Sequence, residues 1–253
     1  MAYSMVVLVK QTPDLNAVRV DRATGQPLLG DQLVMSSADA IAVEAALQLK
    51  EAHGGEITVV SAGPPSVKDV LTRALAMGAD KGLLIPVENP NVLDTLAMAK
   101  IIADALSGTT FDLILAGQHA DDYESGQVPA QVAELLGIAQ VSWVTKIEAN
   151  GGELSFERDT EDGKQGVIAS TPLVVMTAES LNEPRYPSLK GIMAAKKKPI
   201  ETASVSAPAA SGAISWSAPM AQSRPSAGII VQDKPAADAA AELVAWLKSN
   251  KLA

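Results

Sequence analysis

The sequence contains no cysteine, few aromatic residues and only two histidines, His53 and His119. Without cysteine, the chain has no disulfide, no iron–sulfur ligand, no thiolate nucleophile and no cysteine-bound zinc. Two isolated histidines in polar surroundings are more often surface residues than metal ligands, and no nucleophile elbow accompanies them. We therefore expect no metal site and no catalytic acid, base or nucleophile.

Aromatic residues make up 3% of the 253 residues, and 20 basic against 29 acidic side chains give a net charge of −9. A chain with few stacking platforms and an acidic balance is poorly suited to nucleic acid. No apolar run approaches the ~18–20 residues of a membrane span, and the N-terminus lacks the basic region of a secretion signal. With 47% hydrophobic residues, the chain is expected to be globular and cytoplasmic.

The first 137 residues alternate between short apolar runs and longer amphipathic stretches. Strands buried on both faces are expected at residues 5–9, 57–60, 82–87 and 111–117. Helices are expected at residues 37–53, 92–106 and 125–137, and after a capping box formed by Ser66 and Asp69. This order predicts an α/β fold, nucleotide-binding-like, in which helices cover both faces of a twisted parallel sheet.

The pattern changes after residue 141. Alternating runs on both sides of Asn150 predict a β-hairpin, and residues 172–177 a further buried strand. A short helix is expected near residues 190–198. The alanine-, serine- and proline-rich residues 200–226 read as an extended arm whose Ile214, Trp216 and Met220 suggest contact with a partner subunit, and a last helix spans residues 236–247. We thus expect an α/β part at residues 1–199, and an arm with a C-terminal helix at residues 200–253 that packs on the partner.

Ligands of an open parallel sheet bind outside the carboxyl ends of its strands. Three loops fit this position, after residues 5–9, 57–60 and 111–117. In the last loop, Ser125 offers a hydroxyl, Gly126 allows close backbone approach and the following helix offers its N-terminus to a phosphate. The carboxylates of Asp121 and Asp122 are expected to bond ribose hydroxyls or to face water. No dinucleotide fingerprint or P-loop occurs, and an ordinary polar loop with a serine cap is an equal alternative at this point.

The segment at residues 181–198, LNEPRYPSLKGIMAAKKK, closely resembles the signature of the electron-transfer flavoprotein β subunit. Residues 8–10, 42–46, 61–64 and 74–80 support this resemblance, which covers roughly residues 5–200. The resemblance implies a heterodimer with an α subunit that carries the redox-active FAD. Such a complex accepts electrons from flavin dehydrogenases and passes them toward a membrane quinone oxidoreductase.

The resemblance also implies that this chain holds AMP as a structural ligand. By position, the implied contacts are Leu8, Ser36, Ser37, Ala38, Asp39, Ala62, Gly117, Gln118, His119, Ala120, Asp121, Asp122, Tyr123, Glu124, Ser125, Gly126 and Gln127. The chain departs from many members in having Ser36-Ser37 where they have Asn-Pro. It also lacks the Asp-Gly-Asp-Thr pattern of bifurcating members, which favours AMP.

Two other functions stay open. One is the β subunit of a bifurcating, NADH-oxidising complex with FAD in this chain. The other is a stand-alone nucleotide sensor that resembles the universal stress proteins.

In the family, the loop around Leu189 grips partner dehydrogenases. The docking residues implied here are Arg185, Tyr186, Pro187, Ser188, Leu189, Lys190, Ile192 and Met193. A leucine on a loop held by prolines is a preorganised apolar anchor, and Arg185, Lys190 and the lysines at 196–198 could steer acidic partners. The alternative is that Leu189 packs inside. Asp159 aligns with a family acidic residue near the α subunit's FAD, although an ordinary hairpin carboxylate is equally plausible there.

Overall fold

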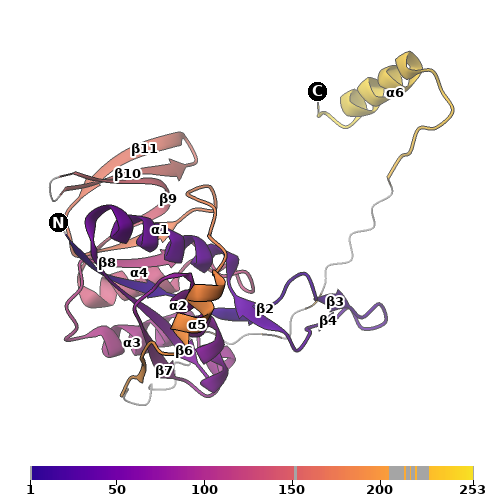
Figure 1. The fold of residues 1–253 in the computed structure, drawn as a ribbon. Helices are drawn as coiled ribbons and strands as arrows, with labels where there is room; N and C mark the ends of the chain where they lie inside the picture. Colours follow the sequence, from indigo (N-terminus) through magenta and orange to yellow (C-terminus); the bar gives the residue numbers. More distant parts are fainter. Residues whose placement is uncertain are drawn as a thin grey trace.

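The computed structural model describes residues 2–150, 153–204, 214, 217, 220 and 228–252. A nine-stranded sheet runs through the body of the molecule in the order β11-β10-β9-β12-β8-β1-β6-β7-β13 (Figure 1). Its five central strands are parallel: β12 (Leu173–Thr177), β8 (Leu113–Gly117), β1 (Tyr3–Leu8), β6 (Gly55–Gly63) and β7 (Lys81–Pro86). The four strands predicted before residue 137 and the one predicted at residues 172–177 are therefore confirmed.

Helices cover both faces of this sheet, as the sequence predicts. On one face lie α1 (Ser37–His53) and α2 (Lys68–Met77), and on the other α3 (Thr95–Leu106) and α4 (Val128–Leu136). Side chains alternate along β1: Val7 packs in the α1–α2 layer, whereas Val6 and Leu8 pack in the α3–α4 layer. The short helix α5 (Leu189–Ala195) packs on α2, and 3₁₀ turns η1 (Pro65–Val67) and η2 (Pro90–Val92) follow β6 and β7.

Beyond β12 the sheet continues through one more parallel strand, β9, and then through two strands that pair antiparallel, β10 and β11. β9 (Ala139–Asn150) and β10 (Glu153–Thr160) form the predicted hairpin, and β9 lies parallel to β12. A third strand, β11 (Gly163–Ala169), pairs with β10. The sequence analysis did not predict β11, because two glycines and mostly exposed side chains leave little apolar alternation in this run.

Two small ribbons follow β1. β2 (Gln11–Pro13) pairs with β5 (Leu33–Met35), and β3 (Arg19–Val20) pairs with β4 (Pro27–Leu28). The β3–β4 ribbon projects from the body (Figure 1).

The C-terminal region begins inside the sheet. β13 (Ile200–Thr202) pairs in parallel with β7, three residues past the predicted boundary at 199. Ile214 and Met220 are exposed, and Trp216 lies outside the described residues. The helix α6 (Ala236–Ser249) has no buried residue and stands apart from the body in Figure 1. Packing of this region on a partner stays a prediction.

Two helices begin later than predicted because the expected residues do not cap them. The Ser66 hydroxyl donates to the Gln11 side chain at 2.8 Å instead of capping α2, which begins at Lys68. Asp94 accepts the backbone N–H of Ala97 at 2.8 Å, so α3 begins at Thr95. The helix expected from residue 125 begins at Val128. No helix in the described ranges is long and apolar enough to cross a membrane.

Candidate functional site: a crevice at the carboxyl ends of the strands

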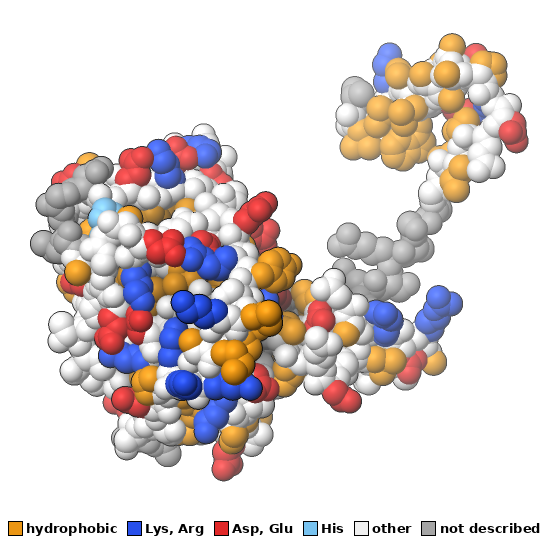
Figure 2. Space-filling view, viewed as in Figure 1, with side chains coloured by type: hydrophobic (Ala, Val, Ile, Leu, Met, Phe, Trp, Pro, Cys, Tyr) orange, Lys and Arg blue, Asp and Glu red, His pale blue; other side chains and the backbone are white. Residues whose placement is uncertain are grey.

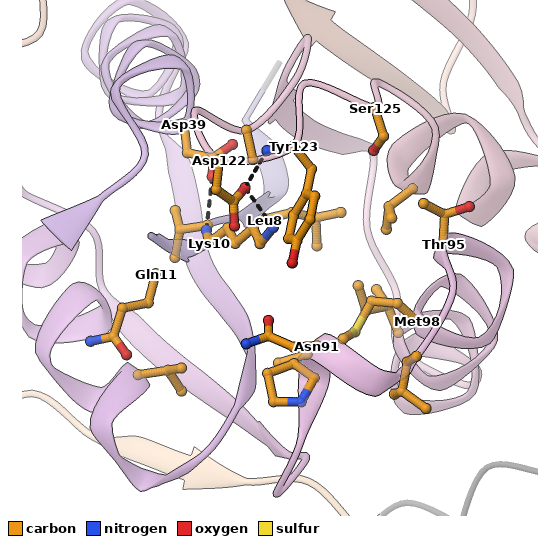
Figure 3. A pocket seen from close by; sticks show the side chains of 18 of the residues that line it. Leu8, Lys10, Gln11, Asp39, Asn91, Thr95, Met98, Asp122, Tyr123 and Ser125 are labelled. Carbon is orange, nitrogen blue, oxygen red and sulfur yellow. Dashed lines mark hydrogen bonds and ion pairs between the residues drawn. The ribbon is translucent and has the colours of Figure 1, made fainter. Parts of the chain in front are cut away.

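A cavity of about 530 Å³ opens where the strand order reverses direction. From β1 the chain proceeds outward to β6 and β7, then returns to β8 on the other side of β1. Ligands of open α/β sheets bind at such a switch point. The walls of the cavity come from the segments after β1, β6, β7 and β8 (Figure 3).

Asp39, in the first turn of α1, ties the two strands beside this switch point together. One of its carboxyl oxygens accepts the backbone N–H of Lys10 at 2.8 Å, and the other accepts that of Gly117 at 3.1 Å. The side chain is buried and lines the cavity. A Cβ on Gly117 would lie 2.7 Å from the Ala38 backbone, so only glycine lets β8 end this close to α1. The three elements therefore meet at one carboxyl group.

Burial is the main influence on the acidity of Asp39. Desolvation is the largest cause and, together with the nearby Asp121, raises the pKa of this carboxyl group, which lies at about 7 when all contacts are included. The hydrogen bonds from Lys10 and Gly117 lower the pKa and offset only part of this effect. Asp39 therefore exchanges a proton near neutral pH.

Asp121 reaches across from the β8–α4 loop to cap α1. Its carboxylate accepts the Ser37 backbone N–H at 2.8 Å and the hydroxyls of Ser37 and Ser36 at 2.8 and 3.1 Å. Ser36 occupies the N-cap position without a side-chain cap of its own. Both oxygens of Asp121 thus accept hydrogen bonds at the N-terminus of α1, a role that was not predicted. Contact of this carboxylate with a ribose stays a prediction.

Asp122 is also engaged within the chain. Its carboxylate accepts the Lys10 ammonium at 2.7 Å and the Tyr123 backbone N–H at 3.0 Å. The Lys10 ammonium lies 4.9 Å from the centre of the Tyr123 ring. These three residues join the end of β1 to the β8–α4 loop along one wall of the crevice (Figure 3).

Eleven of the seventeen residues predicted to contact a nucleotide line the cavity. They are Leu8, Asp39, Ala62, Gly117, His119, Ala120, Asp122, Tyr123, Ser125, Gly126 and Gln127. The other six do not line it: Ser36, Ser37, Ala38, Gln118, Asp121 and Glu124. Of these, Gln118 supports the loop by accepting the Trp143 backbone N–H at 2.7 Å.

The wall formed by residues 88–95, after β7, was missed. Asn91 and Thr95 point toward the crevice from this side, and Met98 follows on α3 (Figure 3). The signal was available, because β7 is parallel to β6 and its carboxyl end must lie at the same edge. Lys10 was also missed as a lining residue.

The chemistry of the lining suits a nucleotide. Leu8, Val60 and Met98 give an apolar wall for a base. Gly126 has a φ of +62°, which turns the chain into α4, and Ser125 lies beside that turn. The His119 Nδ1 atom is buried and has no hydrogen-bond partner among the described residues. Among the described residues, no cluster of three acidic or histidine side chains could hold a metal ion.

Comparison with known proteins matches the sequence of this chain to a protein family. Residues 29–208 match the model of the electron transfer flavoprotein domain. The chain is 41% identical over 253 residues to the electron transfer flavoprotein subunit beta of Syntrophomonas wolfei, which covers 99% of this chain and 98% of that protein. It is 40% identical over 199 residues to the subunit of the same name from Bacillus subtilis, with 78% and 77% of the two chains covered. The chain belongs to the electron transfer flavoprotein β-subunit family.

The signature segment of this family forms an exposed apolar surface around α5. Leu189 is 84% exposed and Tyr186 89%, and Ile192 and Met193 are exposed beside them. We call these four residues the α5 patch. The alternative that Leu189 packs inside is therefore wrong. Figure 2 shows apolar and basic side chains next to one another on the face that carries α5, and the Ser188 side chain fixes the start of the helix by accepting the Gly191 N–H at 3.0 Å.

Arg185, predicted to steer partners of the flavoprotein, instead fastens the loop to α1. Its guanidinium donates to Glu44 at 2.7 and 2.9 Å and also binds Glu51. Burial alone would raise the pKa of Glu44, but hydrogen bonds from Arg185 and Gln48 outweigh it and lower that pKa. Lys198 is likewise committed, because its ammonium binds the carbonyl oxygens of Leu75 and Ala79 at the end of α2.

The remaining predicted basic residues, Lys190, Lys196 and Lys197, are exposed around the α5 patch. Asp159 is exposed on β10 and lies opposite Lys164 of β11. Its place near the α subunit's flavin stays a prediction.

The raised pKa of Asp39 predicts that stability falls as the pH rises from 5 to 7. In this range the folded chain keeps a proton that the unfolded chain has already lost, so the free energy of unfolding decreases by about 2 kcal/mol. The Asp39→Asn variant cannot titrate here and lacks this contribution. Urea unfolding of the wild type and of this variant at pH 5, 6 and 7 measures the contribution. If the free energy of unfolding changed equally with pH in both proteins, the raised pKa of Asp39 would be contradicted.

The Arg185 ion pairs predict a second effect on stability. The Arg185→Ala variant leaves the buried Glu44 carboxylate without its partner and should lower the free energy of unfolding by about 2 kcal/mol. Adding Glu44→Gln should restore most of the lost free energy of unfolding, because the unpaired buried carboxylate is then absent. The exposed Lys190→Ala variant is the control in urea unfolding at pH 7. If Arg185→Ala and Lys190→Ala lowered the free energy of unfolding equally, Arg185 would not be holding the loop.

Proposed function

We propose that this chain is the β subunit of a heterodimeric, cytoplasmic electron carrier whose α subunit holds the redox-active FAD. The complex takes electrons from flavin dehydrogenases and passes them toward a membrane quinone oxidoreductase. This chain binds AMP in the crevice and offers the α5 patch to the dehydrogenase. The observation that carries the proposal is the family match together with a cavity at the strand ends that eleven of the implied contacts line.

The crevice supports nucleotide binding through its own residues. Leu8 and Ala62 lie at adjacent strand ends on the apolar side of the cavity, which suits an adenine ring. The β8–α4 loop lies opposite, where Ser125 and the free N–H groups at the start of α4 suit a phosphate. None of these groups carries out chemistry on the ligand, which agrees with a structural role for it.

The α5 patch supports docking through its exposure and its rigidity. Leu189 is the first residue of α5, whose start is capped by Ser188, and Arg185 anchors the preceding loop to α1. An apolar side chain held in place loses little conformational entropy when a partner covers it. The exposed lysines around the patch favour an acidic partner surface.

The size of the cavity favours a second candidate, FAD in this chain as part of a bifurcating, NADH-oxidising complex. Beyond the nucleotide loops, the cavity continues to Gln11, Pro13, Leu29 and Leu33 on the β2–β5 side. That extension leaves room for more than a mononucleotide.

The released nucleotides separate the two candidates. Acid extraction of the purified heterodimer followed by mass spectrometry should give one AMP and one FAD per complex. Two FAD and no AMP, with bleaching of the visible flavin bands by NADH, would establish the bifurcating function instead. Release of no adenine nucleotide from this subunit would contradict both.

Docking through the α5 patch predicts a specific kinetic defect. The Leu189→Ala variant should raise the KM of a donor dehydrogenase for the complex about tenfold, because an exposed anchor contributes to binding and little to the core. Nucleotide content and melting temperature should not change. Leu135→Ala, an exposed leucine on α4 in the opposite layer, is the matched control. Loss of nucleotide or early melting in Leu189→Ala would contradict the docking role.

A further inference from the structure

The charges that line the crevice are unusual for a site that binds phosphate. Four carboxyl groups line it, those of Asp39, Glu88, Asp94 and Asp122. Among the described lining residues, Lys10 is the one lysine or arginine. A site for several phosphates normally offers more cationic groups than this.

The charge of Lys10 is cancelled within the chain. Its ammonium lies 2.7 Å from the carboxylate of Asp122, whose side chain is only 15% exposed. Asp122 is held in that position by the Tyr123 backbone N–H, and Lys10 by the face of the Tyr123 ring. The pair lies on one wall of the crevice (Figure 3), so a ligand meets a neutral ion pair there rather than a free cation.

The other phosphate-binding groups are neutral. Ser125 contributes a hydroxyl, and the start of α4 contributes backbone N–H groups. These donors can serve one phosphate group. Each added phosphate would bring more negative charge into a cavity whose other titratable lining side chains are mostly acidic, and the described part of the lining offers it no uncompensated lysine or arginine.

We infer that Asp122, by neutralising Lys10, limits the crevice to nucleotides that carry about two phosphate charges and makes it reject nucleoside di- and triphosphates. This inference rests on the proposed binding of a nucleotide in the crevice, and it defines which nucleotides the crevice accepts by their phosphate charge. Asp122 is then a specificity-determining residue that acts through Lys10.

The test is competition for labelled AMP bound to the purified heterodimer. Wild-type complex should lose the label to unlabelled AMP at concentrations at least tenfold lower than to ADP, and ATP should compete more weakly still. The Asp122→Asn variant keeps an oxygen for the Lys10 and Tyr123 donors but removes the negative charge. Its affinity for ADP should rise about tenfold, while its affinity for AMP changes less than threefold.

Two further variants show whether the freed Lys10 ammonium causes the gain in affinity for ADP. Glu134→Gln removes one charge from an exposed position on α4, outside the cavity, and should leave the order of affinities as in the wild type. Adding Lys10→Gln to Asp122→Asn should abolish the gain for ADP, because the freed ammonium is then absent. The inference is wrong if Asp122→Asn strengthens all three nucleotides equally, or if wild type binds AMP and ADP alike. If the wild type retains no labelled AMP at all, the proposed nucleotide site itself fails.

Discussion

The carboxyl group of Asp39 accepts backbone N–H groups at the carboxyl ends of two neighbouring strands, β1 and β8. The candidate site is built around this contact. Lys10 follows β1 and Gly117 ends β8, and both donate to the Asp39 carboxyl group. Because α1 supplies Asp39, the helix, the two strand ends and the opening between them are fixed by one buried group. Asp121 completes the arrangement from the other side by capping α1. These contacts hold the loop that carries Asp122, Tyr123 and Ser125 against the crevice.

The crevice and the α5 patch lie at opposite ends of α2. The cavity is lined by Ser66 and Val67, which precede α2, whereas Lys198 of the segment after α5 binds carbonyl oxygens at the end of that helix. A helix of ten residues spans about 15 Å, so the two surfaces do not share residues. A protein that covers the α5 patch would therefore leave the crevice open, which agrees with the proposal that a ligand there has a structural role.

Much of the fold could be predicted because it depends on local patterns. Apolar runs such as that at β8 are typical of strands buried on both faces, and glycines such as Gly137 mark helix ends. The switch-point crevice followed from the order of these elements. What the sequence could not reveal were contacts between distant residues: the cap of α1 comes from Asp121, and Arg185 turns inward to Glu44. Side chains of the same type can face solvent or another element, and only the folded arrangement decides between them.

Hydrogen–deuterium exchange of the purified heterodimer shows directly whether a nucleotide binds at the ends of β1 and β8. It compares the complex with saturating AMP and the complex after nucleotide removal. Exchange should slow on binding in peptides that cover residues 8–10 and 117–128, and stay unchanged in those covering residues 189–195. Unchanged exchange at residues 117–128, or slowing confined to another surface, would contradict a nucleotide site at the ends of β1 and β8.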